Sequence, residues 1–210
     1  MWKHHTKVAG LEWKNPVGTA SGTFQYAAVR WFYDVSQLGA VCTKGASPVP
    51  WEGNPSPRTA ESPAANINAV GLQNPGIDHY LAEDLPKLKA AGAFVISNVA
   101  GHCDDDYAAV VEKLADSDAD MLEINVSCPN VSAGGMSVGT DPVALANLMD
   151  RLRPMTDKPM IVKLTPNVTD ITVPARAAVE HGADALSMIN TLKGMRINIR
   201  TGKPIIANVT

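Results

Sequence analysis

The composition of the chain is typical of a folded globular domain. Its 210 residues are 45% hydrophobic and 19% charged, so the chain has enough apolar side chains to bury a substantial core. The formal net charge is -3, and the 18 Lys and Arg are scattered along the chain, so we expect no broad basic surface for nucleic acid. No stretch approaches the ~18 consecutive apolar residues of a membrane helix, so no membrane contact is expected.

The cysteines and the N-terminal residues are typical of a protein in a reducing compartment. Cys42, Cys103 and Cys128 are odd in number and lack C-x-x-C spacing, which suits a reducing environment better than a disulfide framework. The first residues contain no apolar segment of the kind found in secretion signals. We therefore expect a soluble protein of the cytoplasm.

Strand-like and helix-like segments alternate along the chain, which predicts a parallel sheet with crossover helices. Short apolar runs predict strands at residues 17–20, 40–43, 94–97, 121–124, 160–164 and 185–189. Helical patterns fall between them, at residues 26–37, 78–91, 106–115, from 142 onward, and 170–181. Residues 46–74 are rich in Pro, Gly and Asn and predict a long functional loop or lid, and a hairpin is expected around residues 200–202.

This alternation predicts an α/β fold of the (β/α)8 TIM barrel type. Six strand-helix units are visible in the sequence, whereas eight are needed to close such a barrel. We therefore expect residues 1–210 to form a single barrel domain, truncated after about strand six and lacking the C-terminal part of the barrel.

Polar side chains stand at the ends of the predicted strands. Lys44, Asn98, Asn125 and Asn190 each follow a strand, and Lys163 lies one residue inside the end of another. In α/β barrels the carboxyl ends of the strands carry the chemistry, so these side chains are expected to meet at one mouth. A buried lysine is costly unless an anion or an electron-rich ring accepts it, although a single lysine often extends to solvent instead.

A thiol follows the fourth predicted strand. Cys128 lies between Asn125 and Asn130, just past the apolar run Met121-Leu122-Glu123-Ile124. At a strand exit this thiol is a candidate acid or base among amides that can hold a planar polar ligand. The alternative is a buried structural cysteine before a turn, because free Cys is among the most buried residue types.

Five sequence motifs, in order along the chain, resemble the catalytic subunit of class 1B dihydroorotate dehydrogenases. They are Thr19-Ala20-Ser21-Gly22-Thr23-Phe24, Asn68-Ala69-Val70-Gly71-Leu72-Gln73-Asn74-Pro75-Gly76, Asn125-Val126-Ser127-Cys128-Pro129-Asn130, Lys163-Leu164-Thr165-Pro166-Asn167-Val168-Thr169-Asp170-Ile171 and Ile189-Asn190-Thr191-Leu192-Lys193-Gly194-Met195.

The resemblance implies a fold, a reaction and partners. It implies an FMN-binding barrel that oxidises dihydroorotate to orotate in pyrimidine biosynthesis. It also implies a partner subunit that carries FAD and a [2Fe-2S] cluster and passes electrons to NAD. The expected assembly is a homodimer of catalytic subunits within a heterotetramer.

The resemblance also assigns residues to roles, and it implies no metal site. Cys128 would be the general base. FMN would be held by Ser21, Lys44, Gly45, Asn98, Asn125, Lys163 and Ile189. The substrate would be held by Lys44, Asn68, Ala69, Val70, Gly71, Leu72, Asn125, Asn190 and Thr191.

Some positions depart from the family pattern, and two other readings stay open. Gln25 and Ala27 stand where glycines are frequent, Asn198 where Asp is common, and His102-Cys103 where small or hydroxyl residues are usual. A metal site at His102, Cys103 and the aspartates that follow is disfavoured because no second ligand cluster at zinc spacing exists. The alternatives are the FMN barrel of a dihydropyrimidine dehydrogenase, which tends to have His at the position of Asn130, and a non-catalytic fragment.

Overall fold

A parallel five-stranded sheet forms the centre of the molecule. The computed structural model describes residues 4–127 and 138–208. The strands are β3 (Val41–Cys42), β6 (Val95–Val99), β7 (Met121–Asn125), β8 (Met160–Lys163) and β9 (Ala185–Ser187). They lie side by side in chain order, β3-β6-β7-β8-β9, so every crossover joins neighbouring strands. The α/β fold class is confirmed, and the sheet is an open arc of a (β/α) barrel.

The first predicted strand, at residues 17–20, is wrong as a strand. A single parallel bridge joins Gly18 to Ala40, which places the segment beside β3. The N–H of Thr19 donates to the carbonyl of Ala40, and the N–H of Gly39 donates to that of Val17. The ladder does not continue because the N–H of Cys42, the next donor on this side, donates to the side-chain hydroxyl of Thr19 and not to a backbone carbonyl.

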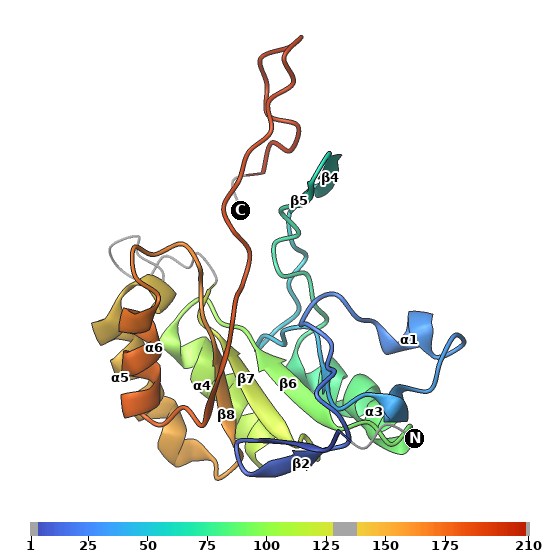
Figure 1. Cartoon of the computed structure of the whole chain (residues 1–210), viewed down its shortest axis with the longest axis vertical. Helices are drawn as coiled ribbons and strands as arrows, with labels where there is room; N and C mark the ends of the chain where they lie inside the picture. Colours follow the sequence, from blue (N-terminus) through green and yellow to red (C-terminus); the bar gives the residue numbers. More distant parts are fainter. Residues whose placement is uncertain (1–3, 128–137, 209–210) are drawn as a thin grey trace.

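The helices cover one face of the sheet (Figure 1). They are α4 (Asp104–Ala115), α5 (Pro142–Leu152), α6 (Thr172–Glu180) and a continuous helical stretch of α2 (Ile77–His79), η2 (Tyr80–Asp84) and α3 (Leu85–Ala90). The middle turn of this stretch, η2, is π-helical. Pro86 has no N–H to donate to the carbonyl four residues earlier, and a π turn accommodates that missing bond.

The helix predicted at residues 26–37 is wrong in extent. The structure has α1 (Tyr26–Val29) and a separate 3-10 turn η1 (Val35–Gln37). The Asp34 carboxylate accepts the N–H of Ser36 and so begins a new turn. Trp31 and Phe32 between the two elements are 76% and 83% exposed, so no apolar stripe holds this segment as one helix.

The two faces of the sheet bury different side chains. Val95, Val99, Leu122 and Ile124 point toward the helices and belong to the larger of the two core clusters. The opposite, inward face begins with a small apolar cluster of Ala40, Cys42, Ile96, Met121 and Ile161. Toward the carboxyl ends of the strands, the inward positions become polar. The side-chain alternation of two residues therefore turns a seemingly apolar run such as β7 into one apolar and one partly polar face.

An N-terminal hairpin, which the sequence analysis did not anticipate, closes the apolar end of the inward face. It consists of β1 (Thr6–Val8) and β2 (Leu11–Trp13). Trp13 packs against Phe94 with ring centroids 5.7 Å apart, just before β6 begins. Figure 1 shows β2 beneath the sheet, at the end away from the chain segment that follows β9.

Two segments extend away from the sheet on the same side (Figure 1). One is the hairpin of β4 (Thr59–Ser62) and β5 (Ala65–Asn68), which lies within the predicted long loop. The other is residues 188–208, where a bridge between Ile197 and Pro204 confirms the predicted hairpin. Asn208 Nδ2 donates to the carbonyl of Pro55 (2.8 Å), which ties the two segments together. In the described ranges, no helix combines the length and the apolar character needed to cross a membrane.

Candidate active site

Four side chains meet on the inward face near the carboxyl ends of the strands. The register of the sheet places Asn98 of β6 beside Glu123 of β7. Asn98 Nδ2 donates to Glu123 Oε1 at 2.6 Å, and the Cys42 thiol donates to the same oxygen at 3.3 Å. Lys163 Nζ lies 4.0 Å from that oxygen. We call Cys42, Asn98, Glu123 and Lys163 the carboxylate cluster.

The carboxylate cluster is buried, and its thiol is held neutral. Glu123 is 5% exposed and Lys163 8% exposed. Burial raises the pKa of Cys42 well above its usual value, and the charge of Glu123 and the hydrogen bond to it raise it further, while Lys163 acts in the opposite direction. The thiol is therefore a donor to the carboxylate and not a thiolate.

Glu123 is the member of the carboxylate cluster whose place sequence reasoning missed. It lies in the run Met121-Leu122-Glu123-Ile124, which resembles an ordinary buried strand. A single charged residue inside such a run was the only available signal, because acidic side chains are almost never fully buried unless they are paired. The sequence showed the two candidate lysines, and the structure shows the carboxylate beside one of them.

A second group of polar residues lies next to this cluster. Asn190 Nδ2 donates to Asn125 Oδ1 at 3.0 Å, and Asn190 Oδ1 accepts the N–H of Thr191 at 2.7 Å. Asn125 is opposite Lys163 in the register of β7 and β8. The hydroxyl of the buried Tyr107 donates to the carbonyl of Asn125 (2.9 Å) and so fixes the end of β7. Three of the predicted substrate residues are thus brought together.

The turn after β3 brings Gly45 against Asn98. The N–H of Ala46 donates to the carbonyl of Asn98 at 2.9 Å. A Cβ at position 45 would lie 2.7 Å from Asn98 Oδ1, so only glycine fits without a shift. Asn98 Oδ1 is buried and has no hydrogen-bond partner among the described residues. Lys44 reaches toward Gly22, and the backbone of Ser21 faces the Cys42 thiol.

The predicted substrate loop, Asn68 to Leu72, is held by hydrogen bonds within the long loop of residues 46–74. Its described hydrogen bonds go to Asn54, Arg58 and Asn74, and Asn68 pairs with Thr59 in the β4–β5 hairpin, whereas none goes to the strand ends of the five-stranded sheet. The N–H of Ala69 donates to the carbonyl of Arg58, and Asn54 Nδ2 donates to that of Ala69. Gly71 has a positive φ of 74° and packs so closely on Asn54 that a Cβ would meet its backbone nitrogen at 2.7 Å.

Ile189 and Cys128 are the remaining predicted site residues. The sixth strand was predicted to end at Ile189, but β9 ends at Ser187, and pairing resumes only where Asn190 donates to the carbonyl of Leu164. Ile189 is 47% exposed. Cys128 and Asn130 lie outside the described residues. Ser127, which precedes Cys128, donates to the carbonyl of Lys163 at 3.0 Å, so the chain leaves β7 beside the carboxylate cluster.

The region of His102 has a structural explanation. The His102 ring stacks on Trp51, with centroids 3.7 Å apart and planes 18° apart. The three aspartates that follow Cys103 lie in the first turn of α4, and the Asp106 carboxylate accepts the N–H of His102. Within residues 4–127 and 138–208, no group of three His, Cys, Asp or Glu side chains could hold a metal ion.

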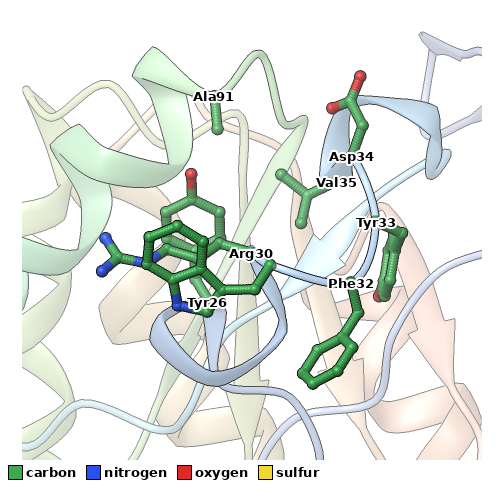
Figure 2. Close-up of a pocket in the computed structure, with 8 residues that line it drawn as sticks. Tyr26, Arg30, Phe32, Tyr33, Asp34, Val35 and Ala91 are labelled. Atoms are coloured by element: carbon green, nitrogen blue, oxygen red, sulfur yellow. The ribbon is translucent and has the colours of Figure 1, made fainter.

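A cavity of about 400 Å³ lies outside this site. It is formed by the exposed turn between α1 and η1, and Figure 2 shows Tyr26, Arg30, Phe32 and Tyr33 around it. Ala91, at the end of α3, closes one side. None of the residues predicted to hold flavin or substrate is among its described lining residues.

The fold and the site together define a class of protein. An arc of parallel strands with amide, carboxylate and ammonium groups at its carboxyl ends is the arrangement of a barrel enzyme. The family model described as "Dihydroorotate dehydrogenase" matches residues 3–210. The chain belongs to the dihydroorotate dehydrogenase family.

Relatives in this family are about 50% identical to the chain over the aligned residues. A protein of Alkaliphilus metalliredigens named "Dihydroorotate dehydrogenase B (NAD(+)), catalytic subunit" is 52% identical over 206 residues, which are 96% of the chain and 67% of the relative. A protein of Lachnoclostridium phytofermentans with the same name is 50% identical over 97% of the chain and 68% of its own length. A protein of Aquifex aeolicus named "Putative dihydroorotate dehydrogenase A (fumarate)" is 48% identical, over 96% of the chain and 66% of its own length.

Proposed function

We propose that the chain oxidises dihydroorotate to orotate in pyrimidine biosynthesis, with FMN as hydride acceptor and Cys128 as general base. The observation that carries this proposal is the meeting of Asn98, Asn125, Lys163 and Asn190 at one end of the sheet, with the chain leading directly from there to Cys128. Residues 1–210 act as one flavin-binding domain in this proposal.

The residues at the strand ends suit a flavin ring. Asn98 Oδ1 is a buried acceptor without a partner among the described residues, which a ring N–H can satisfy. Gly45 leaves the space that a side chain would fill. Lys163 supplies a buried positive charge. In the proposal, FMN is held by Ser21, Lys44, Gly45, Asn98, Asn125, Lys163 and Ile189.

The residues of the chain divide the reaction between them. Cys128, as thiolate, removes the proton from C5 of dihydroorotate, and a double bond forms between C5 and C6. Bound FMN supplies the acceptor for the hydride that leaves C6. The ammonium of Lys44 and the amides of Asn125 and Asn190 donate to the substrate's carboxylate and carbonyls. The loop from Asn68 to Leu72 completes the substrate site.

The electron acceptor is a separate part of the proposal. We propose NAD, reached through a partner subunit with FAD and a [2Fe-2S] cluster, in a heterotetramer built on a dimer of catalytic subunits. The names of the relatives support this acceptor, since "catalytic subunit" and "NAD(+)" occur together in them. A relative with 48% identity carries the fumarate name, so the acceptor needs its own test.

A comparison of two substrates, dihydroorotate and dihydrouracil, tests the reaction. The purified protein should oxidise dihydroorotate and leave dihydrouracil unchanged, because the substrate's carboxylate provides the contact with Lys44. Oxidation of dihydrouracil at an equal rate would favour a dihydropyrimidine dehydrogenase instead. For the acceptor, co-purification should yield an FAD and iron-sulfur subunit, and full activity of the single subunit with fumarate would contradict the NAD proposal.

A further inference from the structure

Glu123 is the buried charge to which the proposed reaction gives no task. Burying a carboxylate costs free energy unless it is paired and hydrogen-bonded, and Glu123 is both. We propose that Glu123 is a positioning residue that orients Asn98 and Lys163 and sets the redox potential of the flavin. This inference rests on the proposed function, because it takes these two residues to face FMN.

Glu123 fixes the orientation of the Asn98 amide. Its Nδ2 is committed to Glu123 Oε1 by a short hydrogen bond of 2.6 Å. The carboxylate accepts but cannot donate, so the amide cannot turn its oxygen toward Glu123. Asn98 Oδ1 therefore faces the turn at Gly45, where it lacks a partner among the described residues. Glu123 thereby presents an acceptor and not a donor to a ligand in that place.

Glu123 also balances the charge of Lys163. Its Nζ lies 4.0 Å from Glu123 Oε1, which is near enough for charge attraction and too far for a hydrogen bond. In a buried place the attraction between the two opposite charges is stronger than it would be in water. At that distance Lys163 spends none of its three N–H donors on the carboxylate, so Glu123 can balance the charge without withdrawing the donors.

The remaining neighbour of the Glu123 carboxylate is Cys42. Cys42 shares Glu123 Oε1, and its thiol is neutral because burial raises its pKa. Cys42 therefore adds a donor and no charge. The net charge of the carboxylate cluster is set by Glu123 and Lys163 alone, and removing the carboxylate leaves the ammonium without compensation.

The consequence is an effect on the flavin's redox equilibrium. Reduction adds negative charge to the ring, so Lys163 favours the reduced form and Glu123 opposes it. Glu123→Gln keeps the size of the side chain and an oxygen that can accept from Asn98, but it removes the opposing charge. We expect this variant to bind reduced FMN about tenfold more tightly relative to oxidised FMN. For a two-electron couple that is a midpoint potential ~30 mV more positive.

The experiment measures FMN binding and midpoint potential, not turnover. FMN is titrated into flavin-free wild type, Glu123→Gln and Glu112→Gln, and the potential of each loaded protein is then found by equilibration with a reference dye. Glu112 is an exposed glutamate on α4, so its variant is a matched control for the loss of one carboxylate. We expect a positive shift in Glu123→Gln and none in Glu112→Gln. We also expect the Glu123→Gln shift to be smaller in a Lys163→Met background, because no uncompensated ammonium is then left behind.

The possible outcomes are distinct. An unchanged potential in Glu123→Gln, or a shift of equal size in the Lys163→Met background, overturns the role of Glu123 and leaves the proposed function intact. Should Glu123→Gln not fold, Glu123→Asp gives the same test, since it withdraws the carboxylate from Lys163 by one carbon. It should shift the potential in the same direction by less, and no shift or a negative one overturns the proposal. A wild type that binds no FMN overturns both proposals.

Discussion

Gly45 offers a direct test of the geometry at the flavin site. In Gly45→Ala the new methyl group would lie 2.7 Å from Asn98 Oδ1 and 3.2 Å from Ala100 Cβ. A carbon and an oxygen do not approach this closely without a shift of one of them. The Asn98 amide is the more movable group, but its Nδ2 is held by Glu123 at 2.6 Å. The substitution therefore either strains the turn at Gly45 or stretches that hydrogen bond.

The size of the effect follows from the bond that is disturbed. A hydrogen bond to a charged group contributes about 1.5–3 kcal/mol, and we expect a loss of free energy of unfolding within this range. For a chain of this length, each kcal/mol lowers the melting temperature by about 2–4 °C. FMN affinity should fall as well, because the displaced amide oxygen and the methyl group both intrude on the proposed ring site. Urea unfolding of the flavin-free protein and FMN titration measure the two effects separately.

The chain supplies a matched control in Gly194→Ala. A Cβ at position 194 meets no atom within 4 Å, so this variant should match wild type in both measurements. In Asn98→Ala the clashing oxygen is absent, so Gly45→Ala should cost less stability in that background than in wild type. Equal stability and equal FMN affinity of Gly45→Ala and wild type would refute the close packing of this turn on Asn98.

Four more predictions follow from the site and the fold. Cys128→Ser should bind FMN and orotate normally but lose about 10²-fold or more in turnover at pH 7, and turnover should recover at high pH. Unchanged turnover at pH 7 would exclude Cys128 as the base. Lys44→Ala should weaken orotate binding about tenfold or more, as followed in the flavin spectrum, because a charge-assisted hydrogen bond is lost; equal affinity would remove Lys44 from the substrate site. Burial raises the pKa of Cys42 in the folded protein. Above about pH 8.5 the unfolded chain therefore loses the thiol proton while the folded chain keeps it, and the free energy of unfolding should fall by up to ~1.4 kcal/mol per pH unit. The fall should be smaller in Cys42→Ser. Asp141 caps α5 by accepting the N–H groups of Val143 and Ala144, so Asp141→Ala should cost about 1 kcal/mol in thermal unfolding, and an unchanged melting temperature would contradict that role.

Strong local signals made parts of the fold predictable from sequence. The strands β6, β7 and β8 were found because parallel strands that are covered on both faces form short apolar runs. The start of α5 was found because Asp141-Pro142 combines a cap with a proline at the first helical position. The N-terminal hairpin was missed because its strands have three residues each and because its turn, Ala9-Gly10, takes positive φ at both residues without the Asn-Gly or Asp-Gly pair typical of such turns.

The site was predictable only in part, because strand ends can be read from a sequence but register cannot. Asn98, Asn125 and Lys163 were found as residues at strand ends. The inward position of Glu123, and its sharing of one oxygen between Asn98 and Cys42, depend on how β3, β6 and β7 are aligned. The positions of Asn68 to Leu72 depend on hydrogen bonds to Asn54 and Arg58 within the same long loop, which no helix or strand pattern encodes.

A single turnover without oxygen tests the central claim most directly. The FMN-loaded protein is mixed with dihydroorotate under anaerobic conditions, and the absorbance of the oxidised flavin is followed while orotate is measured. The account predicts loss of the flavin absorbance with one orotate formed per flavin, and a much slower loss at pH 7 in Cys128→Ser. Flavin that stays oxidised in the wild type after addition of dihydroorotate would contradict the account.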